Sequence, residues 1–243
     1  TLIQLIGADQ QGYYFKGIAI EDEPRFTWRG LLVSQPYHFM PMDVIKRTID
    51  AMAAVKMNVL HFYISDDQGY RIESKVYPRL HQLASDGMYF SHEQVREMVQ
   101  YADQRGIRVV PEIDVPGHST AMIYAYPHLA SVARDYALQD HWGVFDPTLD
   151  PTKASTYTFL DSLLTEVASL FPDQYFHIGG DENTGKDWQK NQSIRSFMQS
   201  NNLKTTLALQ NYFNRKVQAI LQKSGKITVG WDEVLMKEVA PAS

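Results

Sequence analysis

The stretch that decides the fold is His177-Ile178-Gly179-Gly180-Asp181-Glu182, in which an apolar strand runs into two glycines and two adjacent carboxylates. Side chains alternate between faces along a regular strand, so two neighbours cannot both point into one site. Two glycines at the strand end relax the backbone limits, so Asp181 and Glu182 can both reach one cleft. Carboxylates that share a water-poor site have pKa values that are pushed apart, which suits acid–base chemistry. Read alone, such a pair more often caps the next helix.

Apolar strands and amphipathic helices alternate on both sides of this stretch. Strands are expected over residues 28–34, 59–64, 108–113, 175–178 and 226–231. Apolar residues recur at helical spacing between them, which predicts helices over residues 41–56, 91–106, 151–171 and 205–223. Ser91 and Gln94 form the pattern of a capping box at the start of the second helix. This alternation predicts an α/β fold with a parallel sheet covered by helices.

The polar residues that stand out fall where these strands end. They are Arg29 near the first strand, then Asp66 and Asp67, Asp114 and His118, Asp181 and Glu182, and Trp231. A (β/α)8 barrel, the TIM barrel, places its active site at these strand ends. A doubly wound sheet also binds ligands there, but it usually shows an early Gly-rich phosphate loop, which is not visible in this sequence.

Only about five β/α units can be counted, whereas a barrel needs eight. We therefore expect residues 24–243 to be the N-terminal part of a TIM-barrel catalytic domain. Residues 1–23 are interpreted as the tail of a preceding domain and a linker, with Thr1 to Ile6 as the end of a helix. An open sheet of five strands would expose an unpaired edge, so the remaining strands are expected from a longer chain or from a second chain.

Composition narrows the class of protein and of partner. The 243 residues are 44% hydrophobic and 12% aromatic, and the formal charge of −5 argues against a nucleic-acid partner. No apolar run approaches the roughly 20 residues of a membrane helix, and no signal peptide is expected in this segment. The absence of cysteine excludes disulfides and a thiol nucleophile. It leaves the compartment open, with the periplasm, cell surface or medium of a bacterium among the options, and nothing indicates the oligomeric state.

Five segments, in order along the chain, carry a family resemblance. They are Pro24-Arg25-Phe26-Thr27-Trp28-Arg29-Gly30, Lys56-Met57-Asn58-Val59-Leu60-His61, Ser65-Asp66-Asp67-Gln68-Gly69, Pro111-Glu112-Ile113-Asp114-Val115-Pro116-Gly117-His118, and the stretch His177 to Glu182. Together they resemble the family 20 glycoside hydrolases, the β-N-acetylhexosaminidases. The resemblance extends over almost the whole chain, and the last segment is its most specific part.

The resemblance implies a retaining glycosidase that removes terminal β-linked N-acetylglucosamine or N-acetylgalactosamine without metal or cofactor. In this family the 2-acetamido oxygen of the substrate acts as the nucleophile and forms an oxazolinium ring. The resemblance implies that Glu182 is the general acid and then the base, and that Asp181 holds the acetamido N–H. It also implies that Asp66 orients His118, which contacts the acid. Without this context, a histidine at a strand end is more often structural.

Substrate-binding residues are implied in the same way. Arg29 is expected to bind sugar hydroxyls through its forked donors, Trp231 to wall the acetamido pocket, and Asp67 to contact substrate. The alternatives are a barrel salt bridge for Arg29 and plain core packing for Trp231. Glu112 and Asp114 are weaker candidates for the site.

The sequence departs from the family pattern after the first strand. Where the family usually has Leu-Asp-x-x-Arg-His-Phe, this chain has Val33 to Phe39, with Ser34 and Tyr37 at the acidic and basic positions. Loss of both charges fits replacement of an ion pair by neutral residues, because loss of one partner alone would leave a buried charge. We interpret this change as altered support beneath Arg29.

Two other classes of function remain open at this point. A metal-dependent hydrolase on the same fold could use His61, His118, His177 and Asp181 as zinc ligands. The chain lacks His-Glu-x-x-His and His-x-His, which weakens that hypothesis. A non-catalytic carbohydrate-binding fragment is the other alternative, and the retained Asp181-Glu182 pair argues against it. His177 is expected to be a hydrogen-bonded core histidine.

Overall fold

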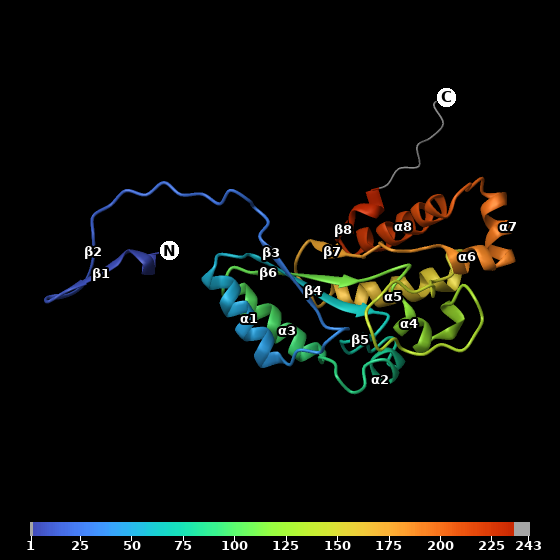
Figure 1. Ribbon diagram of the computed structural model, residues 1–243, viewed down its shortest axis with the longest axis horizontal. Coiled ribbons are helices and arrows are strands. Elements are labelled where there is room, and N and C mark those ends of the chain that lie inside the picture. The colour runs from blue at the N-terminus through green and yellow to red at the C-terminus, as the bar shows by residue number, and fades with distance from the viewer. Residues whose placement is uncertain (1, 236–243) are drawn as a thin grey trace, which may run out of the picture.

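The computed structural model describes residues 2–235, which form one α/β body with an N-terminal arm (Figure 1). The body is built on a parallel sheet, whose strands lie side by side in the order β3 (Gly30–Ser34), β4 (Val59–Asp66), β6 (Arg108–Ile113), β7 (Tyr175–His177) and β8 (Ile227–Val229). The order in space follows the order in the chain, as in a barrel, whereas a doubly wound sheet reverses its order at a switch point. The five predicted parallel strands are confirmed, and their ends agree with the prediction to within two residues.

Helices connect successive strands and cover the sheet. They are α1 (Met42–Ala54), α2 (Arg79–Leu83), α3 (His92–Asp103), α4 (Thr120–Ala125), α5 (Ala154–Ala168), α6 (Lys186–Lys190), α7 (Gln192–Ser200) and α8 (Thr206–Lys223). Helix α1 packs beside α3, and α5 packs beside α8, as Figure 1 shows. Their buried stripes and the inner faces of the strands form one hydrophobic core, while Trp188, Ile194 and Leu209 form a second, smaller cluster.

The four long helices are confirmed, but α5 begins three residues later than predicted. The Asp150 carboxylate accepts hydrogen bonds from the backbone N–H and the hydroxyl of Thr152, which holds a turn before the helix. The short helices α2, α4, α6 and α7 and the two-residue strand β5 (Gly69–Tyr70) were not predicted. Segments of five to nine residues, as these are, cover at most about two and a half turns and show little of a helical period.

The N-terminal arm differs from the expected end of a helix. One 3-10 turn, Leu2–Leu5, is followed by an antiparallel hairpin of β1 (Ile6–Asp9) and β2 (Gly12–Phe15). Residues 16–29 contain neither helix nor strand and join the hairpin to β3. The helix prediction for this segment is wrong beyond that single turn. The assignment of residues 1–23 to a preceding domain and linker stays a prediction.

Strand β3 is less buried than predicted, although its register is regular. Leu31 is 37% exposed and Leu32 is 40% exposed, whereas Val33 is buried. Within the described residues, β3 pairs only with β4, so it forms one edge of the sheet and β8 forms the other. The strand sequence is apolar on both faces, as expected for a strand covered on both sides. No helix among the described residues is long and apolar enough to cross a membrane.

The capping box of α3 gives a test of local stability. The Ser91 hydroxyl accepts the Gln94 backbone N–H at 3.2 Å, and the Gln94 side chain accepts the Ser91 N–H at 2.8 Å. Ser91→Ala should lower the free energy of unfolding by about 1 kcal/mol, because it leaves an N-terminal amide of α3 without its acceptor. Urea unfolding measures the change. Ser196→Ala, at an exposed position of α7, should change stability by less than about 0.5 kcal/mol.

Candidate active site

The carboxyl ends of β4, β6 and β7 bring together residues that lie far apart in the sequence. The His118 Nε2 atom lies 3.3 Å from a carboxylate oxygen of Glu182. On the other side of the ring, His118 Nδ1 lies 2.9 Å from Asp66 and 3.1 Å from Asp67. His118 and both aspartates are buried, whereas the Glu182 side chain is 48% exposed. The structure therefore places the exposed carboxylate at the outer end of a buried chain of polar groups.

His118 carries a positive charge in this setting. Burial opposes protonation of the ring, but the hydrogen bonds with Asp66 and Asp67 outweigh it and raise the pKa of His118 to about 12. An imidazolium has two N–H donors, one for Asp66 and one for Glu182. His118 therefore acts as a fixed donor and cation beside Glu182 and does not act as a base at neutral pH.

The backbone around this chain adopts conformations that most residues avoid. His118 has φ of 47° and Glu182 has φ of 50°, and both lie in the left-handed region. Gly179 has φ of 63°, and a Cβ atom there would lie 2.0 Å from the Asp114 carboxyl group. Only glycine fits at that position, which explains the first glycine of the strand end. Left-handed non-glycine residues cluster at functional sites, where the surrounding structure holds them in place.

Asp181 lies beside a second buried carboxyl group, Asp114. Burial and then the Asp181 charge raise the pKa of Asp114 well above its usual value, so Asp114 is neutral. Burial also raises the pKa of Asp181, and a hydrogen bond from Asp114 acts against this rise. Asp114 is held in turn by the Gly180 N–H at 3.0 Å and the Tyr63 hydroxyl at 3.3 Å. This arrangement orients Asp181 through a neutral neighbour that donates a hydrogen bond to it.

The predicted contact between Asp67 and substrate is wrong. Asp67 is fully buried; one of its oxygens accepts the backbone N–H and hydroxyl of Thr120, and the other contacts His118. Both oxygens are therefore engaged inside the protein. The tight β4–β5 hairpin turns the Asp67 side chain inward, which an alternating strand pattern does not reveal.

The predicted role of Arg29 is also wrong, because this residue precedes β3 and lies at the opposite end of the sheet. Its guanidinium donates to the carbonyl oxygens of Lys56 and Phe26 at 2.6 and 2.5 Å. Gly30 is aligned with Val59 at the start of β4, so the length of the strand, roughly 16 Å, separates Arg29 from the carboxyl ends. Arg29 therefore joins backbone segments at the amino-terminal edge of the sheet.

Tyr37, which was not among the predicted site residues, lies at the carboxyl end of the sheet. Burial and then the nearby charge and hydrogen bond of Asp66 raise the pKa of Tyr37, and Asp67 and Glu182 add to this effect. Its turn is fixed because the Gln35 N–H bonds to Tyr63 and Arg71 bonds to the Pro36 carbonyl. The neutral residues Ser34 and Tyr37 therefore lie near the Asp66 end of the site. Altered support beneath Arg29 is not what the structure shows.

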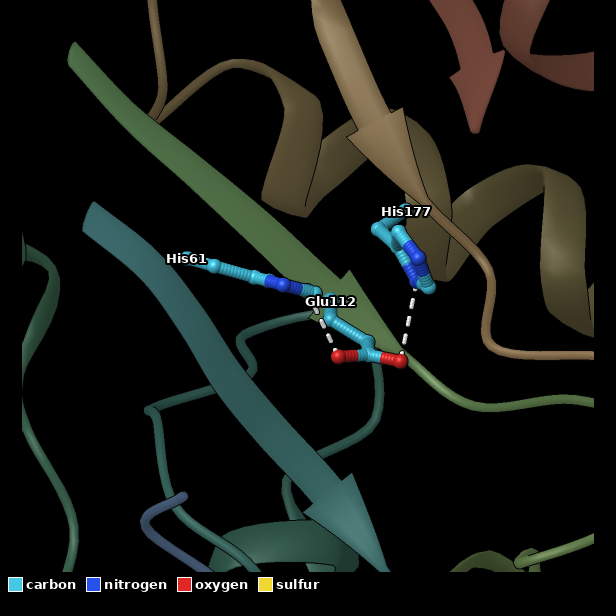
Figure 2. Close-up of side chains that lie close together, drawn as sticks. All are labelled: His61, Glu112 and His177. Carbon is cyan, nitrogen blue, oxygen red and sulfur yellow. Dashed lines mark ion pairs between the residues drawn. The ribbon is translucent and has the colours of Figure 1, made fainter. Parts of the chain in front are cut away.

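Trp231 lies directly after β8, and its ring faces a buried cluster of three side chains. The Trp231 ring centroid is 4.8 Å from that of His177 and 5.7 Å from that of His61. Both imidazoles contact the fully buried Glu112, His61 Nε2 at 2.6 Å and His177 Nδ1 at 2.9 Å (Figure 2). From the sequence, His177 is expected to be a core histidine and Glu112 a weak candidate for the site, and nothing in the sequence pattern links the two.

Among residues 2–235, three groups of side chains carry atoms that could bind a metal, but their contacts match ion pairs and hydrogen bonds better than a bound metal. They are His61, Glu112 and His177; Asp66, Asp67 and His118; and Asp114, His118 and Asp181. Ligand atoms around a tetrahedral zinc lie about 3.4 Å apart, given bonds of about 2.0–2.1 Å. The His61–Glu112 contact of 2.6 Å is much shorter. In the second group His118 Nδ1 lies 2.9 and 3.1 Å from the two aspartates, also closer than two zinc ligands lie, and in the third group Asp114 and Asp181 share a hydrogen bond.

Comparison with known proteins agrees with this geometry. The model of the glycosyl hydrolase family 20 catalytic domain matches residues 26–243. The chain belongs to glycosyl hydrolase family 20. The resemblance noted in the sequence is therefore confirmed, and so is the assignment of the parallel sheet to part of a TIM barrel.

Named relatives are spread over bacteria and eukaryotes. The chain is 39% identical over 259 residues to a beta-hexosaminidase of Porphyromonas gingivalis, which covers 100% of this chain and 33% of that protein. It is 36% identical over 241 residues to the Homo sapiens beta-hexosaminidase subunit beta, which covers 96% of this chain and 42% of that protein. The crystal structure of a Flavobacterium johnsoniae chitobiase aligns with a TM-score of 0.92 and 51% identity, over 99% of this chain and 36% of that one. The chain thus spans well under half the length of these relatives.

The protonation of His118 can be tested directly. Because the pKa of His118 is raised to about 12, its charge stabilises the fold fully below the unfolded value of about 6.5, and this stabilisation is lost as the pH rises towards 12. NMR of 15N-labelled histidines should show a His118 ring that stays protonated between about pH 5 and about pH 9. In the double variant Asp66→Asn and Asp67→Asn, His118 should lose its proton within that range. A ring that titrates near 6.5 in the native protein would contradict this assignment.

The neutral state of Asp114 predicts different effects for two substitutions. Asp114→Asn keeps a donor for Asp181 and an acceptor for Gly180, so it should change the free energy of unfolding by less than about 1 kcal/mol. Asp114→Ala should cost about 1–3 kcal/mol, because it leaves the Gly180 amide and the Tyr63 hydroxyl without their partner. Urea unfolding of the two variants measures the contrast. Equal losses would indicate an ionised Asp114.

Proposed function

We propose that this chain forms part of a β-N-acetylhexosaminidase, which removes terminal β-linked N-acetylglucosamine or N-acetylgalactosamine from glycans. It is the part that bears the two adjacent carboxylates Asp181 and Glu182, called the dyad below. The observation that carries the proposal is the chain Asp66–His118–Glu182, with contacts of 2.9 and 3.3 Å. It places a half-exposed carboxyl group at the carboxyl ends of a barrel sheet, where such folds carry out catalysis. Membership of family 20 supplies the reaction class.

The reaction proceeds in two steps on the substrate. In the first, the acetamido oxygen attacks the anomeric carbon, the bond to the leaving oxygen breaks, and Glu182 gives that oxygen a proton. In the second, Glu182 takes a proton from water as the water attacks the same carbon and the oxazolinium ring opens. Retention of configuration follows from these two displacements.

Asp181, His118 and Trp231 support these steps. Asp181 accepts the acetamido N–H and offsets the positive charge of the ring, and its hydrogen bond from neutral Asp114 keeps it in place. His118 donates to the Glu182 carboxylate that remains after proton transfer. Trp231 lies 36% exposed after β8, and it offers an apolar wall for the acetamido methyl group. No step requires a metal or a cofactor.

The acid role of Glu182 can be tested by varying the leaving group in the full-length natural protein. Glu182→Gln should lower kcat for chitobiose by about 10²–10⁴-fold, because a sugar leaves poorly without a proton. The loss should be smaller with p-nitrophenyl N-acetyl-β-glucosaminide, whose phenolate leaves readily. Release of p-nitrophenol and of N-acetylglucosamine gives the two rates.

Two controls accompany this comparison. Glu93→Gln, at an exposed position of α3, should leave both rates unchanged. Binding of an N-acetylglucosamine thiazoline, which mimics the oxazolinium ring, should persist in Glu182→Gln and shows that the pocket is intact. Equal losses with both substrates would remove Glu182 as the acid. Thiazoline binding by a native protein that hydrolyses neither substrate would favour a carbohydrate-binding function.

A further inference from the structure

The His61–Glu112–His177 cluster crosses three neighbouring strands beneath the dyad. His61 comes from β4, Glu112 from β6 and His177 from β7, and both imidazoles point towards the one carboxylate (Figure 2). Glu112 is fully buried, and each of its oxygens faces a different ring nitrogen. The cluster therefore joins these three strands through side chains.

Glu112 is ionised despite its burial. Burial alone would raise the pKa of Glu112, but the short contacts with His177 and His61 outweigh it, and the pKa lies below its usual value. A carboxylate accepts hydrogen bonds on both oxygens and donates none. Each Glu112 oxygen can therefore accept a hydrogen bond only if the ring nitrogen that faces it carries a proton. This condition would fix the tautomer and the orientation of both imidazoles.

His177 transmits this constraint to the turn that carries the dyad. Glu112 and His177 form the register pair between β6 and β7, so the backbone and the side chains meet at the same residues. His177 Nδ1 faces the Gly179 N–H at 3.1 Å as well as Glu112, so this nitrogen either accepts from the amide or donates to the carboxylate. The Gly179 carbonyl accepts the backbone N–H of Trp231 at 2.9 Å. Two residues after Gly179 comes Asp181.

The same two imidazoles also form the surface against which Trp231 packs. The indole meets His177 edge to face, with an interplanar angle of 64°, and lies tilted at 36° to His61. Trp231 has no regular strand of its own, because β8 ends at Val229. Its position therefore depends on the Gly179 carbonyl and on the two ring faces that Glu112 fixes.

We propose that Glu112 is a positioning residue, which sets the acetamido pocket by holding His61 and His177 and, through them, Trp231 and the Asp181 turn. This inference rests on the proposed hexosaminidase function. It adds that Glu112 helps to determine which N-acyl group the pocket accepts. Glu112 does not touch substrate, so its effect reaches the reaction through Trp231 and Asp181.

The tautomers of the two imidazoles give a test that needs no activity. In the native protein, NMR of 15N-labelled histidines should show a proton on His61 Nε2 and on His177 Nδ1. A glutamine side chain has one acceptor and one donor group, so in Glu112→Gln one of the two rings must change tautomer. His177 is the expected one, because the Gly179 N–H already lies where it can donate to Nδ1.

The ratio of two rates tests the effect on the reaction independently of how much protein is folded. One extra methylene in a fitted pocket costs about 10–200-fold in kcat/KM, so the native protein should prefer an N-acetyl over an N-propionyl substrate by such a factor. Glu112→Gln should lower kcat/KM for the N-acetyl substrate by about 10–100-fold. It should also move the acetyl-to-propionyl ratio towards one.

Glu166→Gln is the matched control. Glu166 is another buried glutamate that faces a histidine; it bonds to Ser74 and Lys75 and lies 3.6 Å from His92, on the outer helix α5. This variant should lose stability but keep the native acetyl-to-propionyl ratio. If Glu112→Gln does not fold, His61→Leu removes one of the two donors and should shift the ratio in the same direction.

Each outcome supports or overturns the positioning role. If the native protein is active and Glu112→Gln keeps the native ratio and tautomers, the positioning role is wrong and the proposed function stands. A native protein that hydrolyses neither substrate would defeat the proposed function and this role with it. One equivalent of zinc that binds to the native protein but not to Glu112→Gln would replace the positioning role by a metal site.

Discussion

The buried ion pair between His118 and the two aspartates of β4 is the interaction on which the site depends. Two adjacent carboxylates cannot remain ionised in a buried setting unless a cation meets them, and His118 is placed to contact both. To reach this position His118 adopts a left-handed backbone conformation, which is unfavourable for a non-glycine residue. The ring that results is charged, oriented and able to donate to Glu182, so one structural ion pair also orients the carboxyl group that we propose as the acid.

Charged and neutral groups alternate across the strand ends. Asp66 and Asp67 face a cation, Asp114 is neutral beside Asp181, and Glu112 is ionised between two imidazoles. Each buried carboxyl group thus has a neighbour that determines its protonation state. These carboxyl groups are buried, whereas Glu182 is half-exposed, as the acid role proposed for it requires.

Most of the fold followed from the sequence because strand and helix periods are local properties. The Asp66–His118–Glu182 chain was implied by the family resemblance, and its members meet because strand ends of a parallel sheet lie at one edge. The same rule excludes Arg29, which precedes its strand, and nearness to a strand was mistaken for a place at its carboxyl end. Asp67 and Glu112 were harder to assign, because side-chain direction depends on a tight hairpin and on contacts between three strands. Neither leaves a periodic signal.

The neutral residues at positions 34 and 37 change the electrostatics at one side of this site. Where the family usually has an acid and an arginine, this chain has a buried Ser34 hydroxyl that finds no hydrogen-bond partner among residues 2–235 and a half-exposed Tyr37 phenol beside Asp66. A phenol can donate one hydrogen bond, but it adds no positive charge to offset Asp66 and Asp67. His118 is therefore the positive charge that contacts and balances these two carboxylates. This dependence explains why its pKa is raised so far, to about 12, and why the ring would remain a cation throughout the reaction.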